Sequence, residues 1–185
     1  MAAPAERTIK DLSGHWTLNK TISDDSDPVL TLQGVGFLMR KAIGIATIQL
    51  EIKQYEDDSA VTHIDIKQTA LKLNSEEART VDDTVRPVKD NIFGDVESKS
   101  LWVSLEDAAV DDEYLKEGWL AEGDGKFVMT VATHPKNGWT AKQIWGFKEV
   151  DGVRRYSRSV VVTKGSESKK IHMHYDYNGP LAPSS

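Results

Sequence analysis

The sequence contains no cysteine, and this absence removes several kinds of chemistry at once. Without thiols the chain can form no disulfide, hold no metal through thiolates and use no cysteine nucleophile. It also has no apolar run near the ~18 residues of a membrane helix, and residues 1–10 contain no hydrophobic leader. We therefore expect a cytoplasmic protein without stable membrane insertion.

The sequence also has no excess of positively charged residues. The 23 Lys and Arg residues are outnumbered by 29 Asp and Glu residues, which gives a formal net charge of −6. This balance argues against nucleic acid and anionic lipid as partners. The glycine pair Gly34-x-Gly36 lacks the preceding strand and the remaining residues of a nucleotide-binding loop, so no cofactor is predicted. The length and composition fit one globular domain, and they leave the oligomeric state open.

The longest helical pattern lies near the N-terminus, between residues 27 and 42. Asp27 is suited to the N-cap position, Pro28 to the first helical position, and Gly34 to the end of the turn. A second short helix is predicted over 37–42. After it the apolar residues alternate with polar ones, as expected for a half-buried strand. This stretch is therefore predicted to be a helix-turn-helix that leads into a sheet.

Alternating patterns predict strands over most of the remaining chain, at 13–20, 46–55, 60–69, 84–88, 99–105, 127–133, 139–149, 153–163 and 171–177. The pairs Asp124-Gly125, Asn137-Gly138 and Asp151-Gly152 suit tight hairpin turns. The acidic residues 74–83 are expected to form a turn. Consecutive antiparallel strands can lose their exposed edges by closing into a barrel.

The predicted fold is thus all-β: a single up-and-down antiparallel β-barrel of about ten strands, capped by a short helix-turn-helix near the N-terminus. We expect this domain to occupy residues 11–178. A disordered leader is expected over 1–10 and a frayed tail over 179–185.

The motif Gly14-His15-Trp16-Thr17-Leu18, followed by Leu32-Gln33-Gly34-Val35-Gly36-Phe37 and Arg40-Lys41, resembles the intracellular fatty-acid-binding proteins. It is also similar to the wider lipocalin-like calycin group. The resemblance covers about the first 55 residues. It implies a barrel of ten strands with a helical lid over a hydrophobic ligand.

The chain departs from that family in two respects. It is longer than the family members, and the extra residues fall largely between 74 and 118, in a segment of unassigned role. The family also ends in an Arg-x-Tyr pair that holds a fatty-acid carboxylate. Tyr175 stands where that arginine would be, so the resemblance does not extend to the carboxylate pair.

Strand parity predicts which side chains line the barrel. In each of the last three strands the mostly apolar face should point into the barrel, and this face also contains polar residues. If the apolar face of 153–163 points inward, Arg158 points inward too. The predicted ligand-binding residues are Trp16, Phe37, Gln143, Trp145, Tyr156, Arg158, Tyr175 and Tyr177. A buried arginine needs a partner. Three alternatives stay open for Arg158: a carboxylate partner, stacking on Trp16, or an outward orientation.

Other polar residues have simpler interpretations. His172-x-His174 could bind a metal from one strand face, but no third ligand is evident, so no metal is predicted and a solvated outer face is expected. The acidic residues 106–117 are expected to form solvated surface, with a short helix or lid.

Two functions remain. The sequence favours binding of a small hydrophobic molecule, a lipid or natural product with a carbonyl or acid group, inside the barrel. The alternative is a cofactor-independent isomerase or cyclase that acts on a hydrophobic polyketide or terpenoid intermediate in the same cavity. Its candidate catalytic residues would be Arg158, Tyr156 and Tyr175, which could stabilise a developing oxyanion.

Overall fold

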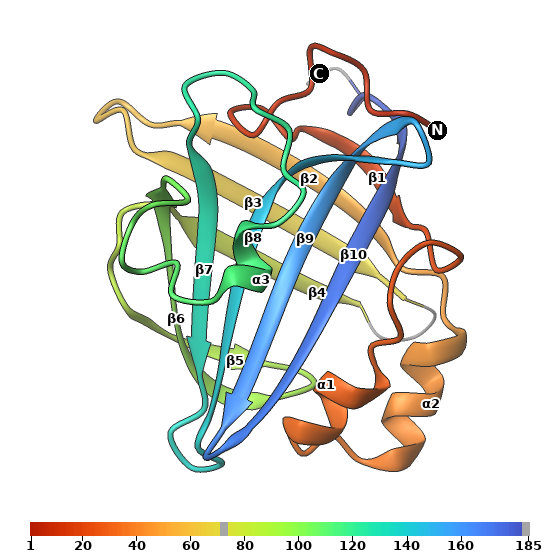
Figure 1. Ribbon diagram of the computed structural model, residues 1–185, viewed down its shortest axis with the longest axis vertical. Coiled ribbons are helices and arrows are strands. Elements are labelled where there is room, and N and C mark those ends of the chain that lie inside the picture. The colour runs from red at the N-terminus through yellow and green to blue at the C-terminus, as the bar shows by residue number, and fades with distance from the viewer. Residues whose placement is uncertain (71–73, 183–185) are drawn as a thin grey trace.

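The computed structural model describes residues 1–70 and 74–182. Ten antiparallel strands form one sheet that curves into a nearly closed barrel (Figure 1), which confirms the predicted fold class. The strands are β1 (Gly14–Leu18), β2 (Gln49–Glu56), β3 (Thr62–Thr69), β4 (Ser75–Thr80), β5 (Arg86–Asp90), β6 (Gly94–Val103), β7 (Phe127–Thr133), β8 (Trp139–Val150), β9 (Val153–Lys164) and β10 (Glu167–Gly179). The helices are α1 (Asp27–Leu32), α2 (Phe37–Ile45) and α3 (Glu113–Lys116).

The barrel has one opening in its hydrogen-bonded wall. The strand order is β4-β3-β2-β1-β10-β9-β8-β7-β6-β5, so β4 and β5 are the two ends of the sheet. A parallel bridge between Val81 and Ser100 joins the end of β4 to β6 instead. Most of β5 is exposed, and Pro87 lies on it, which suits an edge strand because proline cannot donate a ladder hydrogen bond. The seam between β4 and β5 is therefore open, and closure is incomplete.

The turn predicted at 74–83 is wrong, because most of this segment forms β4. Its register with β3 places Glu77 opposite Ile66 and Arg79 opposite Ile64. Both side chains lie on the cavity wall. Since the inward face of β4 is charged, the strand lacks the apolar alternation by which sequence analysis recognises a half-buried strand.

Helices α1 and α2 cover one end of the barrel (Figure 1). Val29, Leu30 and Leu32 of α1 are buried against it. Asp27 is not the N-cap: Ser26 precedes the helix, and the Asp27 carboxylate accepts a hydrogen bond from Arg40 Nε at 3.0 Å. The aspartate thus joins the two helices. Within the described ranges, no helix has both the length and the apolar character needed to cross a membrane.

The predicted disordered leader has a defined place in the structure. It crosses the barrel end opposite the helices (Figure 1), where Ala3, Ile9 and Leu12 are buried in the main core. The backbone N–H of Ala3 donates to Arg154 O at 2.9 Å. Residues 1–12, which we call the N-terminal plug, therefore close this end of the barrel. Of the tail expected at 179–185, only the part up to residue 182 lies within the described residues.

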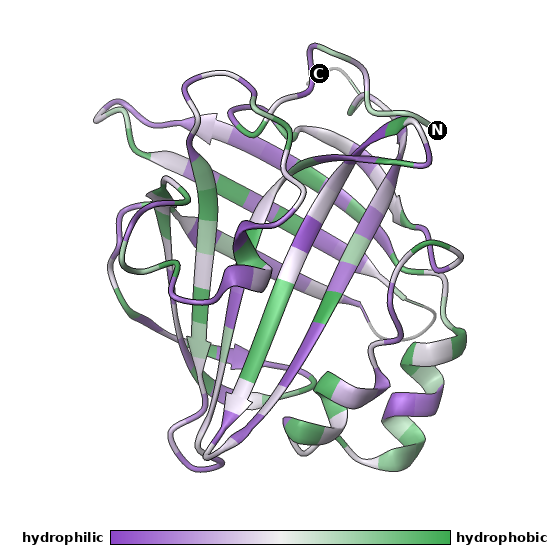
Figure 2. Ribbon diagram, viewed as in Figure 1, coloured by the Kyte–Doolittle hydropathy of each residue, from purple (hydrophilic) through white to green (hydrophobic). Residues whose placement is uncertain are grey.

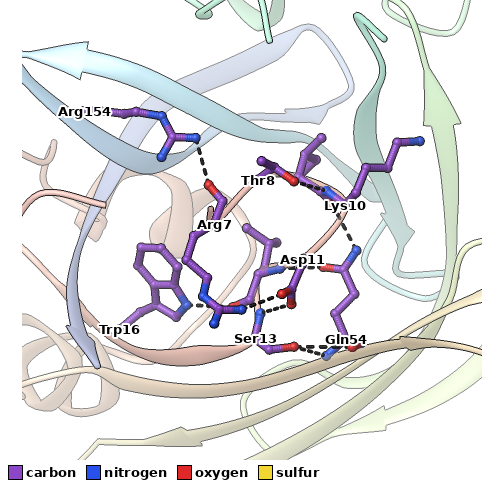
Figure 3. A network of polar contacts seen from close by, with 10 residues as sticks. Arg7, Thr8, Lys10, Asp11, Ser13, Trp16, Gln54 and Arg154 are labelled. Carbon is purple, nitrogen blue, oxygen red and sulfur yellow. Dashed lines mark hydrogen bonds and ion pairs between the residues drawn. The ribbon is translucent and has the colours of Figure 1, made fainter. Parts of the chain in front are cut away.

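Polar contacts hold the plug in place (Figure 3). Trp16 Nε1 donates to Leu12 O at 2.8 Å, and the Gln54 side chain bonds the backbone of Leu12 and Ile9, each at 3.0 Å. Arg154 Nη2 donates to Arg7 O at 2.8 Å. Trp16 is only 1% exposed. It lies beneath this plug.

The predicted parity of the last three strands is correct. Hydrophobic and hydrophilic residues alternate along β10, whereas β9 has a continuous hydrophobic block toward its end (Figure 2). The hairpin between β8 and β9 turns at Asp151-Gly152, where both residues have positive φ, as predicted for an Asp-Gly turn. The residues that face inward from β8 to β10 include Ala141, Arg158, Val160 and Met173.

Candidate functional site

A cavity of about 770 Å³ lies inside the barrel beneath α1 and α2. Its wall is layered in the same order on β8, β9 and β10. Next to the helices it is apolar, with Trp139, Ala141, Val160, Val162, Ile171 and Met173. One step further along each strand come Gln143, Arg158 and Tyr175. The aromatic core around Trp16 follows, and it separates the cavity from the N-terminal plug.

We call the polar end of the cavity the cavity floor. It consists of Gln143, Tyr175 and Arg158, together with Glu77 and Arg79 from β4. The floor is therefore built by both sides of the barrel, and residues far apart in the sequence meet there. The sequence predicted its β8, β9 and β10 members and missed its β4 members. The one sequence feature that could have indicated them is that Glu77 and Arg79 carry opposite charges at alternate positions, which share one face of a strand.

Arg158 is the central residue of the floor, and only 8% of it is exposed. Its Nε donates to the Tyr156 hydroxyl at 2.7 Å, and its guanidinium carbon lies 3.9 Å from the centroid of the Trp145 ring. Among the described residues, its Nη2 atom is buried without a hydrogen-bond partner. Of the three alternatives for Arg158, none is realised: it stacks on Trp145 and not Trp16, it faces inward, and no carboxylate is within ion-pair distance of it in the described chain.

The guanidinium of Arg158 is a permanent positive charge. Burial opposes the charged form, but the tyrosine oxygens and the Glu77 carboxylate raise the pKa of Arg158 above its ordinary value. Arg158 therefore cannot act as a general acid at neutral pH. Any contribution of Arg158 to chemistry in the cavity would therefore be electrostatic.

Arg79 and Glu77 form an ion pair on the opposite wall. Arg79 donates from Nε at 3.0 Å and from Nη2 at 2.6 Å to one oxygen of Glu77. Burial would raise the pKa of Glu77, but Arg79 and Arg158 outweigh it and lower the pKa. The Glu77 side chain is 30% exposed, and it forms part of the cavity wall. The carboxylate is thus ionised next to the cavity.

The other predicted ligand-binding residues lie outside the cavity wall. Trp16, Trp145, Tyr156 and Tyr177 belong to the aromatic core behind the floor or pack against it. Phe37 is 59% exposed on α2. Tyr156 still influences the site, because its hydroxyl orients Arg158. The ligand-binding roles of Gln143, Arg158 and Tyr175 remain proposals.

A second polar group lies on the outer face of the barrel and consists of Lys148, Ser157, Ser159, His172 and His174. We call it the outer polar cluster. Ser159 Oγ lies 2.9 Å from both Lys148 Nζ and His172 Nδ1, and Ser157 Oγ lies 2.8 Å from His174 Nδ1. The solvated face predicted for the histidines is wrong: Tyr114, in α3, stacks on His172 with ring centroids 4.2 Å apart.

The cluster shows the electrostatic effect of burial. Burial, more than any neighbouring charge, lowers the pKa of Lys148 to about 8 and the pKa of His172 to about 4. Within the described ranges, no set of three His, Cys, Asp or Glu side chains is placed to hold a metal ion.

The cavity can therefore hold an elongated hydrophobic molecule with one polar end at the floor. Apolar walls restrict its conformation, and a fixed cation in a site of low dielectric constant strengthens any contact with a negative oxygen.

Comparisons with curated proteins find two relatives over the whole chain. "Probable pericyclase scpY" of Mollisia scopiformis is 32% identical over 182 residues, which cover 97% of this chain and 96% of that protein. "Pericyclase pydY" of Acremonium sp is 28% identical over 186 residues, which cover 98% of this chain and 100% of that protein. No protein-family model matches the chain.

Solved structures confirm the fold. The REP1-NXSQ fatty acid transporter matches with a TM-score of 0.57 and 16% identity, over 92% of this chain and 98% of that one. Fatty-acid-binding protein 1 of Echinococcus granulosus matches with a TM-score of 0.54 and 11% identity, over 89% of this chain and 96% of that one. The resemblance predicted from the N-terminal motif therefore holds for the whole barrel.

Proposed function

This chain belongs to the same family as the probable pericyclase scpY and is also similar to the pericyclase pydY, and from that premise we propose that its cavity catalyses a pericyclic ring closure. Such a reaction moves electrons around a ring of atoms and neither adds nor removes atoms. The product is therefore an isomer of the substrate. The reaction requires a flexible chain to be held in its reactive conformation, which is the contribution of a shaped cavity.

The observation that carries the proposal is the combination of an apolar chamber with a charged floor. A volume of about 770 Å³ lies within the range of small-molecule sites, roughly 300–1,000 Å³, and suits a folded hydrophobic polyene. The apolar layer of β8, β9 and β10 would press the polyene into a compact shape. The floor would fix its polar end, so that the reacting carbons meet in one orientation.

Arg158 has the most direct role in this proposal. Hydrogen bonding from its guanidinium would draw electron density toward an oxygen that is conjugated with the polyene, and this would lower the barrier to ring closure. Tyr175 and Gln143 lie beside it on the wall and would orient the same oxygen. Tyr156 acts on the reaction through Arg158, as a positioning residue.

Sequestration of a hydrophobic molecule is the second candidate, and the same cavity favours it. Binding is the first step of both functions, so affinity alone does not separate them. Only conversion of the bound molecule to an isomer identifies a pericyclase.

The test begins with disruption of the gene in its own host, followed by mass spectrometry of culture extracts. We expect a compound to accumulate that has the mass of the normal product and a different retention time. Purified protein should convert this compound to the normal product, and heat-denatured protein should not. Recovery of the compound unchanged from a tight complex would support sequestration instead.

The cytoplasmic location also belongs to the proposal, as does a small hydrophobic substrate as the main partner. A fluorescent fusion expressed in the host would test the location.

A further inference from the structure

We infer that the cavity floor binds a singly charged, planar oxyanion, either a carboxylate or the enolate of a 1,3-dicarbonyl group. The inference extends the proposed function. That this anion is the polar end of the substrate rests on the proposed function. It is carried by the charges and hydrogen bonds of the floor itself.

The floor carries two positive charges and one negative charge, so one positive charge is not balanced by a protein group of the floor. It holds the guanidinium groups of Arg158 and Arg79 and the carboxylate of Glu77. Glu77 is engaged by Arg79 at 2.6 Å and makes no hydrogen bond to Arg158 in the described structure. A buried charge without a partner is strongly unfavourable, and a bound anion would remove that cost.

The hydrogen bonds of Arg158 indicate where the anion belongs. Tyr156 satisfies Nε, whereas Nη2 is buried and has no partner among the described residues. Buried N–H groups without partners are rare in folded proteins and indicate a missing acceptor. Arg158 forms part of the cavity wall, so we infer that this acceptor belongs to a ligand held in the cavity.

The geometry also favours a planar group. The guanidinium carbon lies over the Trp145 ring, 3.9 Å from its centroid, and the Tyr156 hydroxyl holds Nε, so the guanidinium is restrained on two sides. A guanidinium donates in its own plane to two coplanar oxygens, as carboxylates and enolised 1,3-dicarbonyls present them. A doubly charged phosphate would exceed the single unmatched charge. The other charged side chains of the wall lie at the helical end or along the seam, such as Arg40, which pairs with Asp27.

The position of this cation differs from that implied by the family resemblance. Tyr175 on β10 replaces the expected arginine, but the neighbouring strand supplies another. In the register of β9 and β10, Arg158 lies opposite Met173, and Tyr175 lies opposite Tyr156. The anion site is therefore retained and has moved to the adjacent strand.

Fluorescent ligands can test the inference without knowledge of the substrate. We would measure the binding of cis-parinaric acid, a conjugated tetraene carboxylic acid, and of its neutral methyl ester. The wild-type protein should bind the acid at least about tenfold more tightly than the ester, since charge-assisted hydrogen bonds are about twice as strong as neutral ones. A second pair, a long-chain 2-acyl-1,3-dione and its O-methyl enol ether, separates enolate from carboxylate recognition.

The Arg158→Met variant should lose the preference for the acid while its affinity for the ester is retained. Lys41→Met is the matched control, because it removes an exposed cation at the helical end of the same cavity, and it should keep the preference. If Arg158→Met does not fold by circular dichroism, Arg158→Gln takes its place.

Equal affinities within both ligand pairs in the wild type would overturn the inference, and so would a preference that survives in Arg158→Met. These results are independent of catalysis. A preference for the anion in a protein that converts nothing would contradict only the proposed function. Ring closure by a protein that prefers the anion in neither pair would contradict only the anion site.

Discussion

At the scale of single residues, the charge of Arg158 is the main determinant of the proposed chemistry. We expect Arg158→Leu to lower the rate of ring closure about a hundredfold or more, because it removes a preorganised hydrogen-bond donor from the transition state. The free energy of unfolding should stay level or rise, since an apolar side chain replaces a desolvated charge.

Single-turnover kinetics with the compound from the disrupted host would measure this rate, and chemical denaturation would measure stability. Arg86→Leu is the control, because Arg86 pairs with Asp82 on the exposed part of the seam. A rate in Arg158→Leu equal to that of wild type would show that the guanidinium takes no part in the reaction.

The outer polar cluster should make the free energy of unfolding depend on pH. Burial holds the pKa of His172 at about 4, below the ~6.5 of an unfolded histidine, so the unfolded chain binds more protons between these values. The free energy of unfolding should therefore fall as the pH drops from 6.5 to 4. After allowance for its partial exposure, His172 should account for roughly 1–2 kcal/mol of this loss.

His172→Asn keeps a hydrogen-bond acceptor near Ser159 and cannot become charged, so it should flatten the curve in this range. His15→Asn, which makes the same substitution on β1 away from the cluster, is the matched control. Denaturation by urea at a series of pH values would show the difference. Identical slopes for His172→Asn and wild type would remove His172 as the cause.

At the scale of structural elements, the N-terminal plug should behave as core. Leu12 is fully buried, so Leu12→Ala should lower the free energy of unfolding by about 2–5 kcal/mol. Leu38→Ala makes the same change at a side chain that is 82% exposed on α2, and it should cost less than about 0.5 kcal/mol. Similar losses in thermal or urea denaturation would mean that the plug is not part of the cooperative unit.

The contact of β8 with β7 and with the segment before β7 can be tested at a glycine. A Cβ atom at Gly146 would lie 2.8 Å from the Phe127 ring and 3.1 Å from the Trp119 ring. Gly146→Ala should therefore destabilise the protein by roughly 1–3 kcal/mol through overpacking. Gly44→Ala, inside α2 with no atom within 4 Å of the added carbon, should be neutral or slightly stabilising. Equal stabilities of the two variants would contradict this packing.

Elements with strong local signals were predictable from the sequence, and others were not. The helix-turn-helix has Pro28 at its start and Gly34 at the turn, and the Asp151-Gly152 turn requires positive φ, so both could be placed. β4 was missed because Glu77 and Arg79 face inward. The plug was missed because scattered residues such as Leu12 show no periodicity, and their burial depends on Trp16 beneath them.

At the scale of the whole molecule, the barrel and half of its floor follow from the sequence. Parity on β8, β9 and β10 places Gln143, Arg158 and Tyr175 on one wall, because a strand has only two faces. The opposite wall could not be predicted, since its position depends on how far the sheet curves. Only the structure shows that Arg79 approaches the same Trp145 ring as Arg158, at 5.3 Å.

The open seam also has a consequence for the order of folding events. Every neighbouring strand pair in the sheet is consecutive in sequence except β1 and β10, which join Trp16 to Tyr177. This one pairing must close a loop of nearly the whole chain, and such contacts slow folding. The two ends of the chain lie together there, since Tyr177 N donates to Met1 O at 3.1 Å.

A circular permutant could therefore begin at β5, continue through β10, cross a short linker to the plug, and end at β4. Every hydrogen-bonded strand pair would then be formed by consecutive strands, and the new termini would lie at the seam. We expect this permutant to refold about tenfold faster than the natural order and to bind the same ligands. Stopped-flow refolding would measure the difference, and an unchanged rate would show that joining β1 to β10 does not limit folding.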